Sequence, residues 1–188
     1  MTTHLRYTRL AMLLHWLIAA MMITNVMLAL IAESLPDDWV RPAIDTHKSI
    51  GITVLGLGLV RLLWRVANTP PEMPAAYPSL ERRAAHVAHW ALYGVMFALP
   101  LSGWLHDSAW AQAAAHPMYL FGLFEWPRLG FVGGFSQPMQ DQLHDLLGWA
   151  HTSFGYLLYA LLALHILGAL KHQFIDRHAE FQRILPLN

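Results

Sequence analysis

The sequence contains no cysteine. This absence excludes disulfide bonds, thiolate metal centres, iron–sulfur clusters and the covalent haem attachment that needs a Cys-x-x-Cys-His motif. Charged residues are also scarce, at 13% of the 188 residues, and the formal net charge is zero with histidine neutral. Because no basic excess is available to bind phosphates, we expect no nucleic-acid partner.

Apolar side chains, by contrast, are abundant. They make up 56% of the chain, and the mean hydropathy of +0.37 is too high for an ordinary soluble domain of this length. The stretch from Leu10 to Ile31 carries no charge and no convincing small-residue cleavage site after it, so it predicts a retained membrane span instead of a signal peptide. The composition as a whole predicts an integral membrane protein embedded in lipid.

Four apolar segments are long enough to cross a bilayer as helices. We expect these spans at about 9–32, 42–66, 83–106 and 143–171, within a single membrane domain over residues 1–188. The connection before the fourth span contains the aromatic stretch "MYLFGLFEWPRLGF", which predicts a segment lying at the membrane interface instead of a fifth span. The expected fold is an all-α, integral membrane four-helix bundle.

The basic residues predict the orientation of this bundle. An even number of spans places both termini on one side, and that side receives nine of the twelve lysines and arginines. Since positive residues concentrate in the cytoplasm, we expect both termini of this multi-pass protein to be cytoplasmic. The nine are Arg6, Arg9, Arg61, Arg65, Arg82, Arg83, Lys171, Arg177 and Arg183.

Twelve histidines are a high count for so apolar a chain, and ionisable rings are costly within a bilayer. His151 and His165 lie in the fourth span, separated by roughly 21 Å along the helix axis and by a rotation about 40° short of four full turns. Both rings therefore leave the same face of the helix. They lie at two depths, which predicts two separate sites.

Each of these rings has a partner at its own depth on another span. His15 on the first span and His165 on the fourth both lie about 9 Å from the cytoplasmic edge. His47 on the second span and His151 on the fourth lie at a similar distance from the outer edge. Two neutral imidazoles that face each other across a bundle can hold a haem iron from both axial sides, with apolar walls around the porphyrin.

Spacing alone leaves other assignments open. His89 lies at the same inner depth as His15 and could be the ligand instead, while His144 and His172 extend the stripe of the fourth helix at heptad steps. A hydrogen-bonded position at the rim or between helices is the simpler interpretation for five histidines. A histidine-lined transporter of metal ions or protons is a further alternative. The five are His86, His89, His106, His144 and His172.

Four segments of the sequence resemble the bacterial four-helix cytochrome b-561 family, which includes a di-haem superoxide oxidase. The likeness covers nearly the whole chain and keeps the order and spacing of the histidines. The outer connection between the third and fourth helices is somewhat longer here than in the superoxide oxidase. The four segments are "YTRLAMLLHW", "DTHKSIGI" followed by "VRLLWR", "AHVAHWALYGVMFALPLSGW" and "GWAHTSFGYLLYALLALHILGALKHQF".

This resemblance implies two non-covalent b haems, each with two histidines as axial ligands of its iron. The inner haem would take His15 and His165, and the outer haem would take His47 and His151. The resemblance also implies electron transfer from superoxide at the outer face to ubiquinone at the inner side. His172 matches a histidine near that quinone end.

Superoxide is an anion, so nearby cations would raise its local concentration at an otherwise acidic outer face. Lys48, Arg41 and Arg128 are the candidates for this attraction. The main alternative function is a haem-b membrane subunit that passes electrons between quinone and a hydrogenase or dehydrogenase partner. Both functions imply one-electron transfer, because two axial imidazoles leave no coordination position for oxygen.

Overall fold

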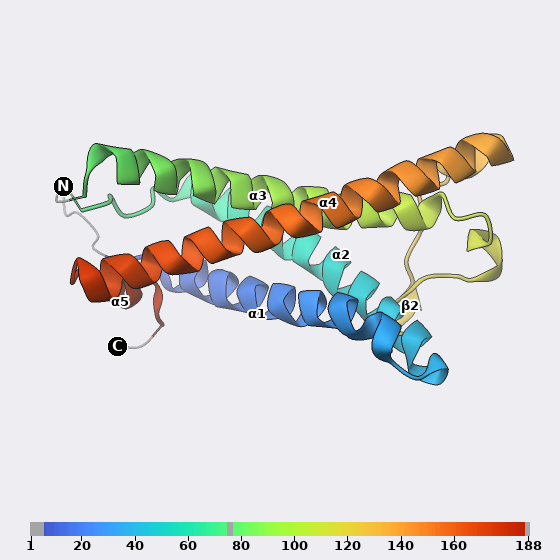
Figure 1. Cartoon of the computed structure of the whole chain (residues 1–188), viewed down its shortest axis with the longest axis horizontal. Helices are drawn as coiled ribbons and strands as arrows, with labels where there is room; N and C mark the ends of the chain where they lie inside the picture. Colours follow the sequence, from blue (N-terminus) through green and yellow to red (C-terminus); the bar gives the residue numbers. More distant parts are fainter. Residues whose placement is uncertain (1–5, 75–76, 187–188) are drawn as a thin grey trace.

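The structure is a computed structural model that describes residues 6–74 and 77–186. Four long helices dominate it (Figure 1), which confirms the predicted all-α membrane bundle. Each of the four is long and apolar enough to cross a membrane. They are α1 (Arg9–Ile31), α2 (Asp37–Ala67), α3 (Ser79–Ser108) and α4 (Gln137–Leu170).

The helices α2, α3 and α4 begin before the expected spans, whereas α1 agrees with its expected span to within one residue. α2 begins at Asp37 and not near residue 42, and α4 begins at Gln137 and not near residue 143. Hydropathy marks only the part of a helix that lies in lipid, whereas the helix continues into water wherever its first turn is stabilised. Asp37 and Asp38 occupy the first turn of α2, where negative charge interacts favourably with the helix dipole.

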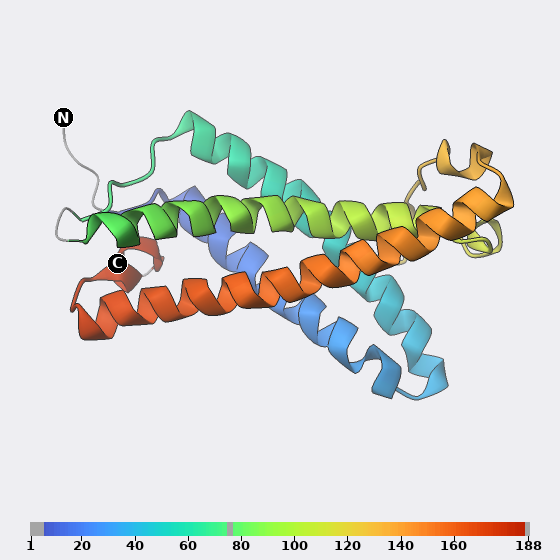
Figure 2. The same cartoon turned by 45° about the horizontal axis from the view of Figure 1, so that its top comes forward.

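The four helices form two pairs. α3 lies beside α4 and α1 beside α2, while α2 also contacts α3 and so joins the pairs. Figure 2 shows α1 and α2 crossing the α3–α4 pair obliquely. Every helix therefore has at least one neighbour against which a polar side chain can be shielded from lipid.

One end of the bundle, here called the terminal end, holds the beginning and the end of the described chain. The amide of Tyr7 donates to the carbonyl oxygen of Arg183 at 3.1 Å. The indole Nε1 of Trp16 donates to the carbonyl oxygen of Ile184 at 3.0 Å, which fixes the short α5 (Glu180–Ile184) against α1. Between α4 and α5 the chain makes a π-helical turn, η4 (Lys171–Ile175).

The opposite end, here called the hairpin end, carries the long connection between α3 and α4. Its strands β1 (Tyr119–Leu120) and β2 (Phe124–Glu125) pair antiparallel, and β1 packs against α2. Phe121 has a φ of 50°, which is unfavourable for a side chain of this size. The buried hydroxyl of Ser49 on α2 accepts a hydrogen bond from the Phe121 amide at 2.9 Å, and this contact holds the turn in place.

Three short 3₁₀ helices complete the connections at the hairpin end. None of them is long enough to span a bilayer, and the described residues contain four candidate spans in all. The expectation that no fifth span follows α3 is therefore confirmed. The three are η1 (Ala32–Ser34), η2 (Ala113–Ala115) and η3 (Val132–Gly134).

The surface of the bundle is strongly apolar. Large side chains such as Leu13, Leu63 and Leu167 are about three-fifths exposed (61%, 60% and 64%), which a soluble protein of this size would avoid. The buried core is small and lies at mid-height, around Ile18, Val54 and Met96. Exposed apolar faces around a sparse core are typical of helices whose solvent is lipid.

Candidate functional site

The histidines with matched depths meet in two pairs across the bundle. His15 on α1 faces His165 on α4 with ring centroids 6.2 Å apart, toward the terminal end. His47 on α2 faces His151 on α4 with ring centroids 6.1 Å apart, toward the hairpin end. The ring planes are steeply inclined within each pair, at 70° and 82°. α4 thus supplies one ring to each pair, as its single histidine face predicts.

The spacing of both pairs suits one metal ion held between two imidazoles. A first-row metal lies about 2.0–2.1 Å from a histidine nitrogen, and the nitrogen lies about 1.1 Å from the ring centroid, so two axial rings should be separated by about 6.3 Å. The observed 6.2 Å and 6.1 Å agree with this value. The geometry therefore fits a bis-histidine iron at each end of the bundle.

Two other ring contacts are too short for a shared metal ion. The ring of His89 lies 5.3 Å from that of His165, which is about 1 Å less than axial ligation needs. The rings of His106 and His144 stack face to face at 3.9 Å. His89 is therefore the weaker candidate for the ligand opposite His165, and the His106–His144 pair serves to join two helices.

Reciprocal hydrogen bonds between α3 and α4 explain the positions of His106 and His144. The Nδ1 atom of His106 on α3 lies 2.8 Å from the carbonyl oxygen of His144 on α4, and the reciprocal contact measures 3.0 Å. A β-carbon at Gly148 would approach the His106 ring to 2.9 Å, so the glycine makes room for the stack. The expected interhelical position of these two rings is what the structure shows.

At the hairpin end, backbone hydrogen bonds orient both facing imidazoles. Nδ1 of His47 lies 3.1 Å from the carbonyl oxygen of Asn25, and Nδ1 of His151 lies 3.0 Å from that of Leu99. An Nδ1–H that donates to a carbonyl leaves the lone pair of Nε2 available for a metal. Both rings are thus held in the tautomer that ligation requires.

A cavity of about 760 Å³ surrounds the hairpin-end pair. Its volume lies within the range of about 300–1,000 Å³ that small-molecule and cofactor sites occupy. Gly103 lines it, and a β-carbon there would come within 3.0 Å of Cε1 of His151. The side-chain oxygen of Asn25, also in the lining, is buried without a hydrogen-bond partner. A cavity of this volume, with a glycine beside a histidine held by a hydrogen bond, fits a flat macrocycle such as haem.

The three cations expected to attract superoxide are all engaged in ion pairs. Lys48 Nζ and Arg128 Nε bind the two oxygens of Asp107 at 2.6 Å and 2.8 Å, and the side chain of Asp107 is only 6% exposed. Arg41 Nε binds the exposed Asp45 at 3.3 Å. The Lys48–Asp107–Arg128 triad keeps one net positive charge, which is less than its lysine and arginine suggested.

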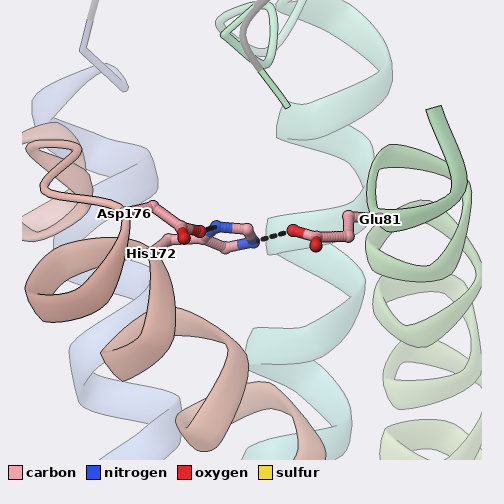
Figure 3. Close-up of side chains that lie close together, drawn as sticks. All are labelled: Glu81, His172 and Asp176. Carbon is pink, nitrogen blue, oxygen red and sulfur yellow. Dashed lines mark hydrogen bonds and ion pairs between the residues drawn. The ribbon is translucent and has the colours of Figure 1, made fainter. Parts of the chain in front are cut away.

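His172 lies in a polar cluster at the terminal end (Figure 3). Its Nδ1 is 2.7 Å from Oδ2 of Asp176, and its Nε2 is 3.7 Å from Oε2 of Glu81 on α3. The ring also stacks on buried Tyr77, with centroids 4.2 Å apart and planes inclined by 9°. The sequence pointed to His172 but not to Glu81 or Tyr77, because these contacts join segments about ninety residues apart.

A family model described as prokaryotic cytochrome b561 matches residues 6–187. The chain belongs to this family. Prokaryotic cytochromes b561 bind haem b and transfer electrons across a membrane, so the chain is a bacterial membrane protein of electron transport. The resemblance of its histidine segments to the cytochrome b-561 family is thereby confirmed.

Three curated relatives of this cytochrome b561 extend the comparison. Cytochrome b561 homolog 2 of Escherichia coli K12 is 33% identical over 182 residues, covering 96% of this chain and 91% of the relative. The probable superoxide oxidase CybB of Yersinia pestis is 27% identical over 187 residues, covering 97% of each chain. Cytochrome b561 homolog 1 of E. coli is 27% identical over 143 residues, covering 76% of this chain and 74% of the relative.

Proposed function

We propose that the chain binds two b haems and oxidises superoxide while reducing ubiquinone. His15 with His165, and His47 with His151, would supply the axial ligands. The observation that carries this proposal is the near-equal ring spacing of two pairs at opposite ends, 6.2 Å and 6.1 Å. Bound haem supplies one-electron transfer here, since both axial positions would be filled by imidazole.

The polar groups at each end support an assignment of the two substrates. The hairpin end places the net positive Lys48–Asp107–Arg128 triad beside the cavity of His47 and His151, where it would attract an anion such as superoxide. The terminal end places His172 among groups that exchange protons, as quinone reduction needs. Superoxide oxidation therefore belongs to the hairpin end and ubiquinone reduction to the terminal end.

The same assignment implies a direction in the membrane. The excess of basic residues at the terminal end supports an orientation with that end in the cytoplasm and the hairpin end in the periplasm, in the inner membrane. Superoxide formed outside the cytoplasm would then be oxidised to oxygen where it arises. The relative named probable superoxide oxidase supports this reaction at 27% identity.

A second function rests on the hairpin itself. The side chains of Phe121, Leu123 and Phe124 are 49%, 79% and 51% exposed around the β1–β2 turn. An exposed apolar surface beside the outer cavity suits either lipid headgroups or a protein that delivers electrons. In that alternative the chain is a haem-b subunit for a hydrogenase or dehydrogenase.

A kinetic experiment separates the two functions. Superoxide is generated enzymatically in the presence of a short-chain ubiquinone, and the haem absorbance of the isolated chain in detergent is followed. The proposal expects rapid haem reduction and formation of quinol without any other protein. If superoxide leaves the haem oxidised but a partner complex reduces it, the result would contradict the proposal and favour the subunit function.

A further inference from the structure

We propose that Glu81, His172 and Asp176 form a proton relay that supplies the protons for quinone reduction at the terminal end. The inference rests on the proposed function and assigns roles to two carboxylates that the electron-transfer chemistry does not itself use. Each ubiquinone takes two electrons from two superoxide ions and two protons from water, which gives two oxygen molecules and one quinol. The chain must therefore conduct protons at the quinone end.

The geometry of His172 suits this task because each ring nitrogen faces a carboxylate. Asp176 Oδ2 lies 2.7 Å from Nδ1, and Glu81 Oε2 lies 3.7 Å from Nε2, on the opposite side of the ring (Figure 3). An imidazole can accept a proton at one nitrogen and release the proton of the other nitrogen. The arrangement thus links the end of α4 to the start of α3 through one titratable ring.

The ring of His172 is less exposed than either carboxylate beside it. The side chains of Glu81 and Asp176 are 32% and 26% exposed, whereas that of His172 is 14% exposed. Both carboxylates therefore contact water, and the shielded ring between them is the member of the relay that exchanges protons. The π-helical turn of η4, which contains His172, is a type of irregularity that occurs frequently at functional sites.

The stacked tyrosine keeps the ring in its orientation. The hydroxyl of Tyr77 donates to Glu180 on α5, and Arg183 holds the same carboxylate at 3.1 Å. Burial is the largest cause that raises the pKa of Tyr77, and the hydrogen bond with Glu180 is the second. The phenol therefore stays protonated throughout the physiological range. Tyr77 and Glu180 are positioning residues that fix the plane of the His172 ring.

The charged groups around the ring come from three elements. Lys171 Nζ binds Glu81 Oε2 at 2.8 Å and Asp176 Oδ2 at 2.9 Å. The hydrogen bond from this ammonium group is the largest cause that lowers the pKa of Asp176, and the hydrogen bond from His172 is the second. The carboxylate therefore stays ionised and accepts a hydrogen bond from the ring. The remaining titratable groups near Tyr77 are His178, Glu180 and Arg183.

A divalent cation is the competing occupant of this cluster. The ligand atoms of Glu81, His172 and Asp176 lie within 4.8 Å of one another, close enough to hold one ion. However, the Lys171 ammonium already bridges both carboxylates and neutralises part of their charge. A metal would have to displace it, whereas a relay works with the lysine in place.

The test separates the quinone step from superoxide chemistry. Haem-loaded protein in lipid vesicles is reduced chemically without superoxide and mixed with a short-chain ubiquinone, while haem oxidation and proton uptake are followed from pH 6 to 9. The variants are His172→Gln, Glu81→Gln and Asp176→Asn. Glu72→Gln, an exposed carboxylate at the same end, is the matched control. Haem content and reduced spectra verify that each variant folds.

The relay predicts that haem oxidation and proton uptake both slow by about 100-fold in His172→Gln, with loss of the wild-type pH dependence and an altered solvent isotope effect. Smaller losses are expected in the two carboxylate variants, and none in Glu72→Gln. Wild-type rates and an unchanged pH profile in all three variants would overturn the relay. A failure of ubiquinone to oxidise even the wild type would instead overturn the proposed function.

The same preparations decide between a relay and a metal site. If the cluster serves only to bind a metal ion, Zn²⁺ should raise the melting temperature of the wild type but not that of Glu81→Gln. The three substitutions should then leave the pH profile of quinone reduction unchanged. That result would overturn the relay. Loss of the pH profile in His172→Gln, in buffers free of divalent cations, supports it.

Discussion

The two ends of the bundle hold similar pairs of rings in different surroundings. At the hairpin end, backbone carbonyls fix Nδ1 of both His47 and His151, and the nearby charges are locked around Asp107. At the terminal end, the described part of the chain offers no such backbone contact to His15 or His165. Glu81, His172 and Asp176 gather there instead.

The difference matches the chemistry proposed for each end. Oxidation of superoxide to oxygen moves one electron and no proton, so fixed groups with a net positive charge suffice. Reduction of ubiquinone to quinol moves electrons together with protons, and groups able to change protonation are needed. The comparison teaches that two histidine pairs of similar spacing can support different reactions, because the residues around each pair differ.

Removing one ring of the terminal-end pair should have the largest effect. His165→Ala is expected to lower the haem content from about two to about one per chain, because a single imidazole holds the iron from one side only. His89→Ala, which removes the ring 5.3 Å from His165, should keep both haems. The measurement is haem per protein in purified material. Loss of a haem from His89→Ala would reassign the ligand and undo the similarity of the two ends.

A methyl group placed against the ring of His151 should destabilise haem binding at the hairpin end and leave the terminal end unchanged. Gly103→Ala would bring a β-carbon to 3.0 Å from His151, a clash that costs about 1–3 kcal/mol as overpacking. We expect a lower melting temperature of the haem-loaded protein and an altered spectrum of the hairpin-end haem. Gly56→Ala, also within a membrane helix but outside the cavity lining, is the matched control, since a β-carbon there would meet no atom within 4 Å. Equal effects of both substitutions would show that the ring does not depend on this glycine.

Neutralising one cation of the Lys48–Asp107–Arg128 triad should slow superoxide oxidation at the hairpin end and leave quinone reduction at the terminal end unchanged. Lys48→Gln leaves Asp107 with Arg128 and no net charge, so superoxide-driven haem reduction should slow by about tenfold at low salt. Arg41→Gln, whose partner Asp45 is exposed, should have less effect. Stopped-flow rates across a salt series provide the measurement. An unchanged rate and salt dependence in Lys48→Gln would remove the triad from superoxide capture.

Acid should produce the smallest effect, confined to the terminal end. Lys171, followed by His172, lowers the pKa of Asp176 in the folded protein below its value in the unfolded chain. The resulting stabilisation is complete above the unfolded value and is lost as pH falls through the lower, folded value. Melting temperatures between about pH 6 and pH 3 should therefore fall slightly more for wild type than for Asp176→Asn. Parallel curves would show that the contact does not contribute to stability.

Much of the architecture follows from the sequence, because lipid imposes simple rules on length and polarity. The four helices and the two depth-matched ring pairs could be predicted from apolar length and from counting along helices. The same counting left His89 and His15 as alternatives, since depth does not reveal which faces of α1 and α3 point at His165. Ring distances between helices were needed to distinguish them.

The interactions that escaped prediction join parts of the chain that no local pattern connects. Asp107 binds Lys48 on α2 and Arg128 in the outer connection, and the path of that connection decides the pairing. Glu81 reaches His172 only because α3 begins beside the end of α4. Periodicity and hydropathy describe single helices, so they carry no information on these contacts.

A redox titration of the purified chain and its four histidine variants tests the central claim most directly. The account predicts two b-type components in the wild type. It predicts that His15→Ala and His165→Ala remove the same one, and that His47→Ala and His151→Ala both remove the other. A wild type without haem, or ring partners whose loss removes different components, would contradict it.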